Sequence, residues 1–339
     1  MIAEFLQGLA CGGSIPFERF MEAALYHPDF GYYTKQVRTV GRTGDFSTWP
    51  GLHDSLARAI AAWLRANPTK HVIEAGAGTG QLAAGVLKHL GFFRRPQLHI
   101  VEISPVLRTT QEKLLKGKNV VWHRDMNEAL AAADGCANVY SNELPDAFPC
   151  RVFVRDSARW MELALKIEGK SAREVLLDCE LPESSSLQGD PPDGSRVEVH
   201  ESYRRWLETW SDSWRRGEML TVDYGATMPG LYHRRPAGSL RAYAHHQRLT
   251  GADVYAAFGH RDITADVNFT DLENWGKSPG WKTVSLGALS EFIRLRCPRI
   301  ALPESFAAAG EVFRVLVQKK GESEGSRPRK QAWFSRHPL

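Results

Sequence analysis

The stretch IEAGAGTGQL, residues 73–82, places three glycines at alternate positions between a short apolar run and a segment with helical periodicity. Glycine lacks a Cβ atom and adopts positive φ angles readily, so Gly76, Gly78 and Gly80 predict a tight strand-to-helix turn. Backbone N–H groups and the positive end of the following helix would face the same point. The stretch therefore predicts a cofactor site at the first strand of a doubly wound α/β sheet.

Two cofactors suit such a turn: dinucleotides and S-adenosylmethionine. The dinucleotide fingerprint GxGxxG, counted from Gly76, requires a glycine where the chain has Gln81. Glu74 would repel a pyrophosphate but attract the sulfonium and ammonium groups of S-adenosylmethionine. We therefore expect S-adenosylmethionine here. A structural turn without a ligand and a nicotinamide-dependent oxidoreductase remain as alternatives.

Acidic residues also stand at the ends of the next two predicted strands. Glu102 lies at the tip of the second strand, where a carboxylate can accept both ribose hydroxyl hydrogens. Asp125, with Met126 beside it, ends the third strand and suits the adenine amino group and ring face. Each acid alone is better explained as a cap or a solvated loop residue, but the ordered series favours adenosine binding.

Strands and helices alternate along the first half of the chain. Helices are expected at 52–66, 79–90 and 105–116, and strands at 71–74, 98–104, 119–125 and 138–143. Apolar strands alternating with helices predict a parallel sheet covered on both faces, a doubly wound, Rossmann-like α/β fold.

This alternation breaks after residue 149. Residues 150–200 predict antiparallel strands and a Pro/Ser-rich loop, which we interpret as an insertion. A helix at 202–216 and a strand at 218–225 then return the chain to the sheet, joined by later elements within 273–286 and 311–320. The expected division is 1–50 (N-terminal helix and lid loop), 51–149 (cofactor-binding core), 150–200 (inserted substrate-side subdomain), 201–320 (remainder of the core) and 321–339 (flexible tail).

Composition excludes few partners. The formal net charge is +4, too small to argue for nucleic acid. No apolar run approaches the roughly 20 residues of a membrane span, and the first residues do not resemble a targeting sequence. The scattered, odd set of cysteines predicts a reducing cytoplasm, or the mitochondrial matrix for a processed precursor; the set is Cys11, Cys136, Cys150, Cys179 and Cys297. Oligomeric state is not indicated.

A Gly-rich loop with aromatic residues occupies 31–50. Such long loops are often lids, so we expect Gly44, Asp45 and Phe46 to fold over the cofactor; an ordered surface loop is the alternative. The segment SNELPDAFP, 141–149, follows the fourth strand, where an acceptor would dock beside the reactive methyl group. Asn142 and Asp146 are also explained as caps of a turn and of a helix.

Two further segments have weaker signals. Asp223 and Tyr224 end the fifth strand. They could form a wall of the acceptor site, and an ordinary turn at the strand end explains them equally well. His245 and His246 lack other ligands nearby, so no metal site is expected.

The chain resembles class I S-adenosylmethionine-dependent methyltransferases, and more narrowly the MidA family, which includes a mitochondrial complex I assembly factor (NDUFAF-type) protein arginine methyltransferase. The similarity covers most of the chain, through segments such as EAGAGTGQL, VEISPVLRTTQEKL, SNELPDAFP and GSLRAYAHH in family order. The residues Thr48-Trp49-Pro50 differ from those usual in the family at this place. The resemblance therefore predicts the cofactor more firmly than the substrate.

This resemblance implies a methyltransferase sheet and methylation of a protein side chain, an arginine of a respiratory-complex-type partner. Paired carboxylates can grip a planar guanidinium, so Glu143 and Asp146, with Asn142, are the expected catalytic residues. A second hypothesis is an assembly or chaperone-like protein that keeps a cofactor pocket and acts mainly by binding a partner.

Overall fold

The computed structural model describes residues 2–10, 12–36, 54–91, 95–168, 171–187, 191–244, 247–300, 302 and 312–321. The predicted lid residues Gly44, Asp45 and Phe46, and also His245 and His246, lie outside the described residues.

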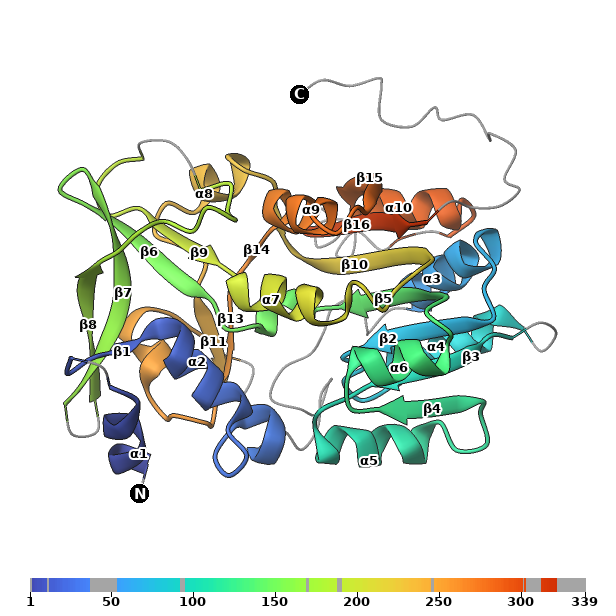
Figure 1. The fold of residues 1–339 in the computed structure, drawn as a ribbon, viewed down its shortest axis with the longest axis horizontal. Helices are drawn as coiled ribbons and strands as arrows, with labels where there is room; N and C mark the ends of the chain where they lie inside the picture. The colour runs from blue at the N-terminus through green and yellow to red at the C-terminus, as the bar shows by residue number, and fades with distance from the viewer. Residues whose placement is uncertain are drawn as a thin grey trace.

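The main sheet has the strand order β15-β16-β10-β5-β2-β3-β4, and β14 pairs with β10 (Figure 1). Strands β2, β3, β4, β5 and β10 are parallel to their neighbours in this set, whereas β16 is antiparallel to both β10 and β15. The bounds are β2 (His71–Ala75), β3 (Gln97–Val101), β4 (Val120–His123), β5 (Ala137–Asn142), β10 (Gly217–Ala226), β14 (Val267–Asn268), β15 (Lys282–Ala288) and β16 (Phe313–Lys320).

The order of winding decides where a ligand can enter. The chain moves outward from β2 through β3 to β4, then returns to the other side of β2 and continues from β5 to β10. Neighbouring loops therefore leave the carboxyl ends of β2 and β5 in opposite directions. Ligands bind at such topological switch points in doubly wound sheets.

Helices cover both faces of the main sheet. Adjacent strand residues point to opposite faces, so Val72 joins one apolar core and Ile73 the other. The first core is closed by α3 (Asp54–Ala66), α4 (Gln81–Leu90) and α10 (Leu289–Arg296), and the second by α6 (Met126–Ala132), α7 (Glu201–Trp210) and α9 (Phe269–Lys277). Helix α5 (Pro105–Leu114) lies beside β4 (Figure 1). The predicted doubly wound α/β fold is confirmed.

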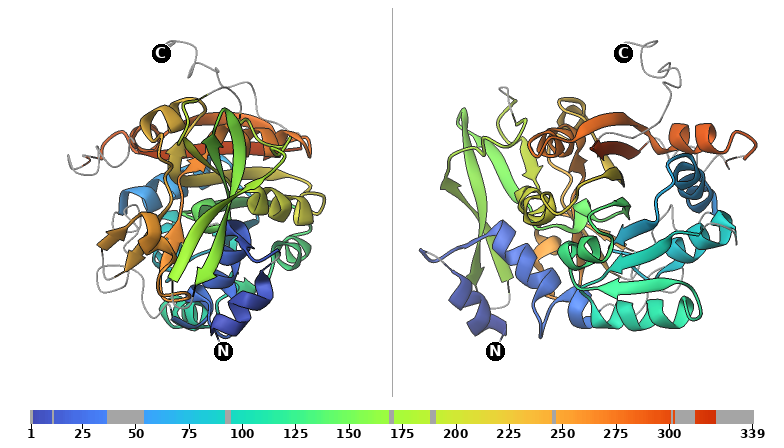
Figure 2. Two further views of the ribbon diagram at one scale, coloured as in Figure 1. Left: turned by 90° about the vertical axis from the view of Figure 1, so that its left-hand side faces the viewer. Right: turned by 45° about the vertical axis from the view of Figure 1, so that its right-hand side comes forward.

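A second, antiparallel sheet forms a separate layer at one end of the molecule (Figures 1 and 2). It consists of β1 (Ile15–Pro16), β6 (Arg151–Asp156), β7 (Arg159–Glu168), β8 (Ser171–Asp178) and β9 (Arg196–Val199). The strands expected between 150 and 200 lie here, whereas the pairing of β1 with β7 was not expected. Helices α1 (Ile2–Leu9) and α2 (Phe17–Tyr26) lie at the same end, and Phe17, Phe20 and Met21 are buried at helical spacing.

A third sheet, of order β12-β11-β13, was missed within the segment assigned to the main core. It contains β11 (Arg241–Ala244), β12 (Gln247–Leu249) and β13 (Asp262–Thr264). The remaining short elements are η1 (Tyr32–Gln36), η3 (Pro145–Ala147), α8 (Gly230–Arg234) and η4 (Gly251–Tyr255). The division of the chain into segments remains a prediction.

Two expected elements need correction. The helix expected at 202–216 ends at Trp210, because the chain turns after Ser211 to start β10. Within 273–286, only the second half is a strand, since residues up to Lys277 belong to α9.

Candidate functional site

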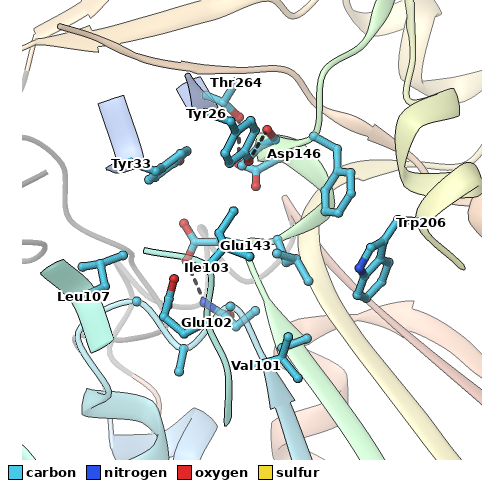
Figure 3. Close-up of a pocket in the computed structure, with 18 of the residues that line it drawn as sticks. Tyr26, Tyr33, Val101, Glu102, Ile103, Leu107, Glu143, Asp146, Trp206 and Thr264 are labelled. Atoms are coloured by element: carbon cyan, nitrogen blue, oxygen red, sulfur yellow. Dashed lines mark hydrogen bonds between the residues drawn. The ribbon is translucent and has the colours of Figure 1, made fainter. Parts of the chain in front are cut away.

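A cavity of about 810 Å³ opens at the switch point between the ends of β2 and β5. Its volume lies in the upper part of the range of small-molecule sites, roughly 300–1,000 Å³. Figure 3 shows Glu102 and Glu143 directed into it, with Leu107 of α5 and Trp206 of α7 on opposite sides. The cavity therefore has room for a cofactor and part of a second molecule.

The glycine turn forms one wall of this cavity. Gly76 and Gly78 have φ angles of 69° and 53°, which disfavour other residues. A Cβ on Gly76 would lie 2.8 Å from Leu144 Cδ1, whereas a Cβ on Gly78 would meet no atom within 4 Å. Both glycines line the cavity; the space beside Gly78 is open, whereas Leu144 fills the space beside Gly76.

Gly80 has a different position. It is the N-cap of α4, with φ of 82°, and is absent from the cavity wall. Its left-handed conformation shapes the turn, and its expected contact with the cofactor is not supported.

Glu74 is a buried carboxylate on the floor of the cavity. Its side chain is 2% exposed and accepts a hydrogen bond of 2.7 Å from the Tyr140 hydroxyl. Burial raises the pKa of Glu74 to about 8, with a smaller contribution from the charge of Glu102. A cation bound beside it would favour the ionised carboxylate.

The raised pKa of Glu74 predicts a pH dependence of stability in the absence of ligand. Between the unfolded pKa of about 4.5 and the folded pKa of about 8, the folded state holds a proton that the unfolded state has lost. The contribution of Glu74 to the free energy of unfolding is therefore fully present below the lower pKa. It is lost as pH rises toward the folded pKa, by at most about 1.4 kcal/mol per pH unit. Denaturant titrations of wild type and Glu74→Gln should show a smaller decline in the variant; parallel pH curves would contradict this.

Glu102 is held by neighbours of the next helix. Its Oε1 accepts from Ser104 N at 2.8 Å, and its Oε2 accepts from Gln111 Nε2 at 2.8 Å. An ionised carboxylate has about four acceptor sites, so two bonds leave capacity for hydroxyl donors. Glu102 lines the cavity beside the exposed Ile103, which offers an apolar surface to a ring.

Gln111 was not anticipated from the sequence. It is fully buried and donates to Gly78 O at 2.7 Å as well as to Glu102, while its Oε1 accepts from Trp122 Nε1. Gln111 thus joins the glycine turn to the ends of the next two strands. The sequence signal that could have identified Gln111 is its position, a polar residue on the apolar side of an amphipathic helix.

Replacing Gln111 with leucine should weaken the site without blocking it. Three partners lose their bond, and an unsatisfied buried group costs roughly 1–3 kcal/mol. We expect a lower melting temperature and an affinity for S-adenosylhomocysteine reduced about tenfold. Calorimetry against Gln97→Leu, at the start of β3 and outside the cavity, provides the control; equal affinities in the two variants would contradict the role.

Asp125 and Met126 require a correction. The Asp125 carboxylate accepts from Glu128 N at 2.9 Å as the N-cap of α6, and Met126 is buried in the core beneath the sheet. Neither residue lines the cavity. A short strand ends at His123, so the helix begins immediately and Asp125 caps it.

Asn142 and Glu143 form the wall at the end of β5, the strand beside the glycine turn. Glu143 has a φ of 50°, an uncommon angle for this residue, and its Oε1 accepts from Asn142 Nδ2 at 3.0 Å. Burial raises the pKa of Glu143 to about 8, and nearby Asp146 adds to the shift. Asn142 Oδ1 is buried without a hydrogen-bond partner within the described ranges. Of this pair, Asn142 Oδ1 is the acceptor that lacks a donor, whereas Glu143 accepts from Asn142 and from the Tyr224 hydroxyl.

Asp146 lies deeper in the same wall. Its Oδ2 accepts from Thr264 Oγ1 at 2.7 Å, and its backbone N–H donates to Asp223 Oδ2. Burial raises the pKa of the Asp146 carboxyl. Asp146 still lines the cavity, but Asp223 is fully buried behind it, while Tyr224 reaches the wall.

Several residues of this wall come from segments distant in sequence. Tyr26 donates to Ala147 O at 2.8 Å, and Tyr33 donates to Asp262 Oδ1 at 2.6 Å. These residues were missed because only the tertiary fold brings the N-terminal helix and the third sheet to the end of β5. Those that line the cavity are Tyr26, Tyr33, Tyr243, Asp262 and Thr264.

The cavity is strongly acidic. Among the described lining residues, the only basic side chain is Arg205, and it pairs with Glu18 at 2.6 Å. The acidic lining residues are Glu18, Glu22, Glu74, Glu102, Glu143, Asp146 and Asp262. Such a lining favours cationic ligands over anionic ones.

Residues 55–286 match the sequence profile of a family described as "Putative S-adenosyl-L-methionine-dependent methyltransferase". The chain belongs to this family. Its fold is similar to that of a Burkholderia thailandensis protein solved with bound S-adenosyl-homocysteine, with a TM-score of 0.81, 27% identity, and coverage of 94% of this chain and 91% of that one.

Curated relatives include mitochondrial proteins named protein arginine methyltransferase NDUFAF7. The Caenorhabditis elegans homologue is 26% identical over 76% of this chain and 67% of that protein. The Xenopus laevis protein is 25% identical over 84% of this chain and 70% of that protein. The predicted MidA-type family and the class I methyltransferase activity are thereby confirmed.

S-adenosylmethionine is the cofactor of this family, and the described residues suit it. The turn is open at Gly78, where a Cβ would meet no atom within 4 Å, and the buried Glu74 carboxylate complements a cation. Within the described part of the chain, no group of three or more His, Cys, Asp or Glu residues is placed to hold a metal ion. Helices of the length and apolarity needed to cross a membrane are likewise absent from the described residues.

Proposed function

We propose that this methyltransferase modifies a guanidinium nitrogen of an arginine side chain in a protein. The observation that carries the proposal is the pair of side chains at the end of β5, the Glu143 carboxylate and Asn142 with its unpartnered Oδ1, in an acid-lined cavity. A guanidinium is planar, always charged at neutral pH and made only of donors, so it suits a carboxylate and an acceptor that lacks a donor. The relatives named protein arginine methyltransferases support the same substrate class.

Cofactor and acceptor would occupy different ends of the cavity. Glu74, Gly76, Gly78 and Glu102 would hold S-adenosylmethionine, which when bound supplies a methyl group activated on a sulfonium. Because the donor is already activated, the chain mainly has to align the acceptor, an effect that supplies roughly 7–11 kcal/mol.

Glu143 would have two tasks. Its carboxylate would orient the guanidinium and localise electron density on one nitrogen. Pairing with the guanidinium would keep Glu143 ionised, although burial raises its pKa to about 8 without that cation. Methylation of a guanidinium releases one proton, and the ionised Glu143 carboxylate would accept it. Asp146, already bonded to Thr264, would shape the wall and add negative charge.

The test uses protein from cells that lack this chain. Extract is incubated with methyl-labelled S-adenosylmethionine and wild-type protein, and hydrolysed protein is searched for methylarginine. We expect label on arginine. Label on another residue would contradict the arginine assignment, and stable capture of a partner without label would favour the assembly role.

A further inference from the structure

The cavity is lined by further residues that are not assigned to the cofactor or to the acceptor nitrogen. Helix α7 contributes Ser202, Arg205, Trp206 and Thr209, which share one face because they are spaced by three and four residues. Helix α2 contributes Glu18, Glu22 and Tyr26, at intervals of four. These two stripes form the walls of a groove, and Glu22, Arg205 and Thr209 are exposed, so the groove opens to solvent.

Three contacts hold the groove in place. Arg205 of α7 donates to Glu18 Oε1 of α2 at 2.6 Å and bridges the two helices. The Trp206 ring packs against Phe148, with centroids 5.5 Å apart, at the base of the groove. Ser202 Oγ donates to Pro149 O, which fixes α7 to the loop after β5. The groove is therefore continuous with the loop that carries Glu143.

Its length suits a peptide. The two rows of residues span eight and nine helical positions, roughly 10–12 Å at about 1.5 Å per residue. An extended chain advances about 3.3–3.6 Å per residue, so three to four residues would fit. In Figure 3, Trp206 lies on the side of the cavity away from Leu107, so this segment would extend away from the cofactor end.

Charge and surface chemistry define the occupant. The Glu18–Arg205 pair is internally neutral, whereas no hydrogen bond or ion pair joins Glu22 to any described residue. The partly buried Trp206 ring and the free Glu22 carboxylate offer one apolar and one anionic contact.

We propose that this groove binds the polypeptide next to the modified arginine, with Glu22 pairing to a basic residue of that polypeptide and Trp206 covering an apolar one. The inference rests on the proposed arginine methylation and names the flanking sequence that the same site selects. Glu22 and Trp206 are specificity-determining residues, and neither takes part in the transfer.

The test uses a set of synthetic peptides with one arginine in an uncharged background, carrying lysine or glutamate at each position up to about four residues away. Label from S-adenosylmethionine is located on arginine by mass spectrometry. Wild type should prefer one or more lysine peptides over the matching glutamate peptides by about three- to tenfold in kcat/KM. Glu22→Lys should abolish or reverse that preference, and Trp206→Ala should raise KM with little change in kcat.

Glu180→Lys is the matched control, because it makes the same charge change at an exposed site outside the cavity. It should behave as wild type. Labelled peptides whose ranking is the same in wild type, Glu22→Lys and Glu180→Lys would overturn the groove inference and leave arginine methylation standing. Absence of label on every peptide, from a wild type that binds S-adenosylhomocysteine, would contradict the proposed function and the inference with it.

Discussion

Replacing Gly78 with valine is expected to reduce affinity for S-adenosylmethionine at least 100-fold. Gly78 lines the cavity at a φ of 53°, and no atom lies within 4 Å of a Cβ built there. A branched side chain would therefore occupy space at the wall that the cofactor approaches. The positive φ adds about 1–2 kcal/mol of strain, and a 100-fold loss corresponds to about 2.8 kcal/mol of binding free energy. Isothermal titration calorimetry measures the loss.

The control variant Gly91→Val distinguishes the effect of filling the cavity from the effect of backbone strain. Gly91 has a φ of 78° and open surroundings, but it follows the end of α4, outside the cavity. We expect both variants to melt at a lower temperature, with only Gly78→Val losing affinity. Similar affinities in the two variants would refute the assignment of the turn.

The Glu143→Gln variant should lose about 10²- to 10⁴-fold in kcat while binding S-adenosylhomocysteine within about threefold of wild type. Glutamine keeps the size of the side chain but carries no charge and cannot hold the released proton. Because the pKa of Glu143 is raised to about 8, removing its charge should not destabilise the fold. The measurement is transfer of label from S-adenosylmethionine to arginine under single-turnover conditions.

Glu128→Gln is the control for this variant, since Glu128 lies on α6 and accepts from Arg124 N outside the cavity. Its activity should equal that of wild type. Unchanged transfer by Glu143→Gln would remove Glu143 from the mechanism, and a parallel loss of affinity would place Glu143 in the cofactor site instead.

The cofactor end of the cavity was largely predictable because its signals are local. The glycine turn, Glu74 and Glu102 each follow from residues within a few positions of a strand end, where β-strand periodicity and turn chemistry act. The same reasoning failed for Asp125, because a strand-end acid and a helix cap have the same sequence signature, and the structure uses this one as a cap.

The acceptor end was less predictable because it depends on long-range packing. Asn142, Glu143 and Asp146 were identified from their place after β5, and all three line the cavity. Tyr33 and Asp262 are 229 residues apart and meet only when η1 and the third sheet fold against the same loop. Gln111 was hidden for a similar reason, since its partners lie on three different elements.

A crystal structure of the protein with S-adenosylhomocysteine tests the central claim most directly. We predict the ribose hydroxyls within hydrogen-bonding distance of Glu102, the amino acid portion against Gly76 and Gly78, and the sulfur directed toward Glu143. Density for the ligand in the groove between α2 and α7, with Glu102 and the glycine turn uncontacted, would contradict it.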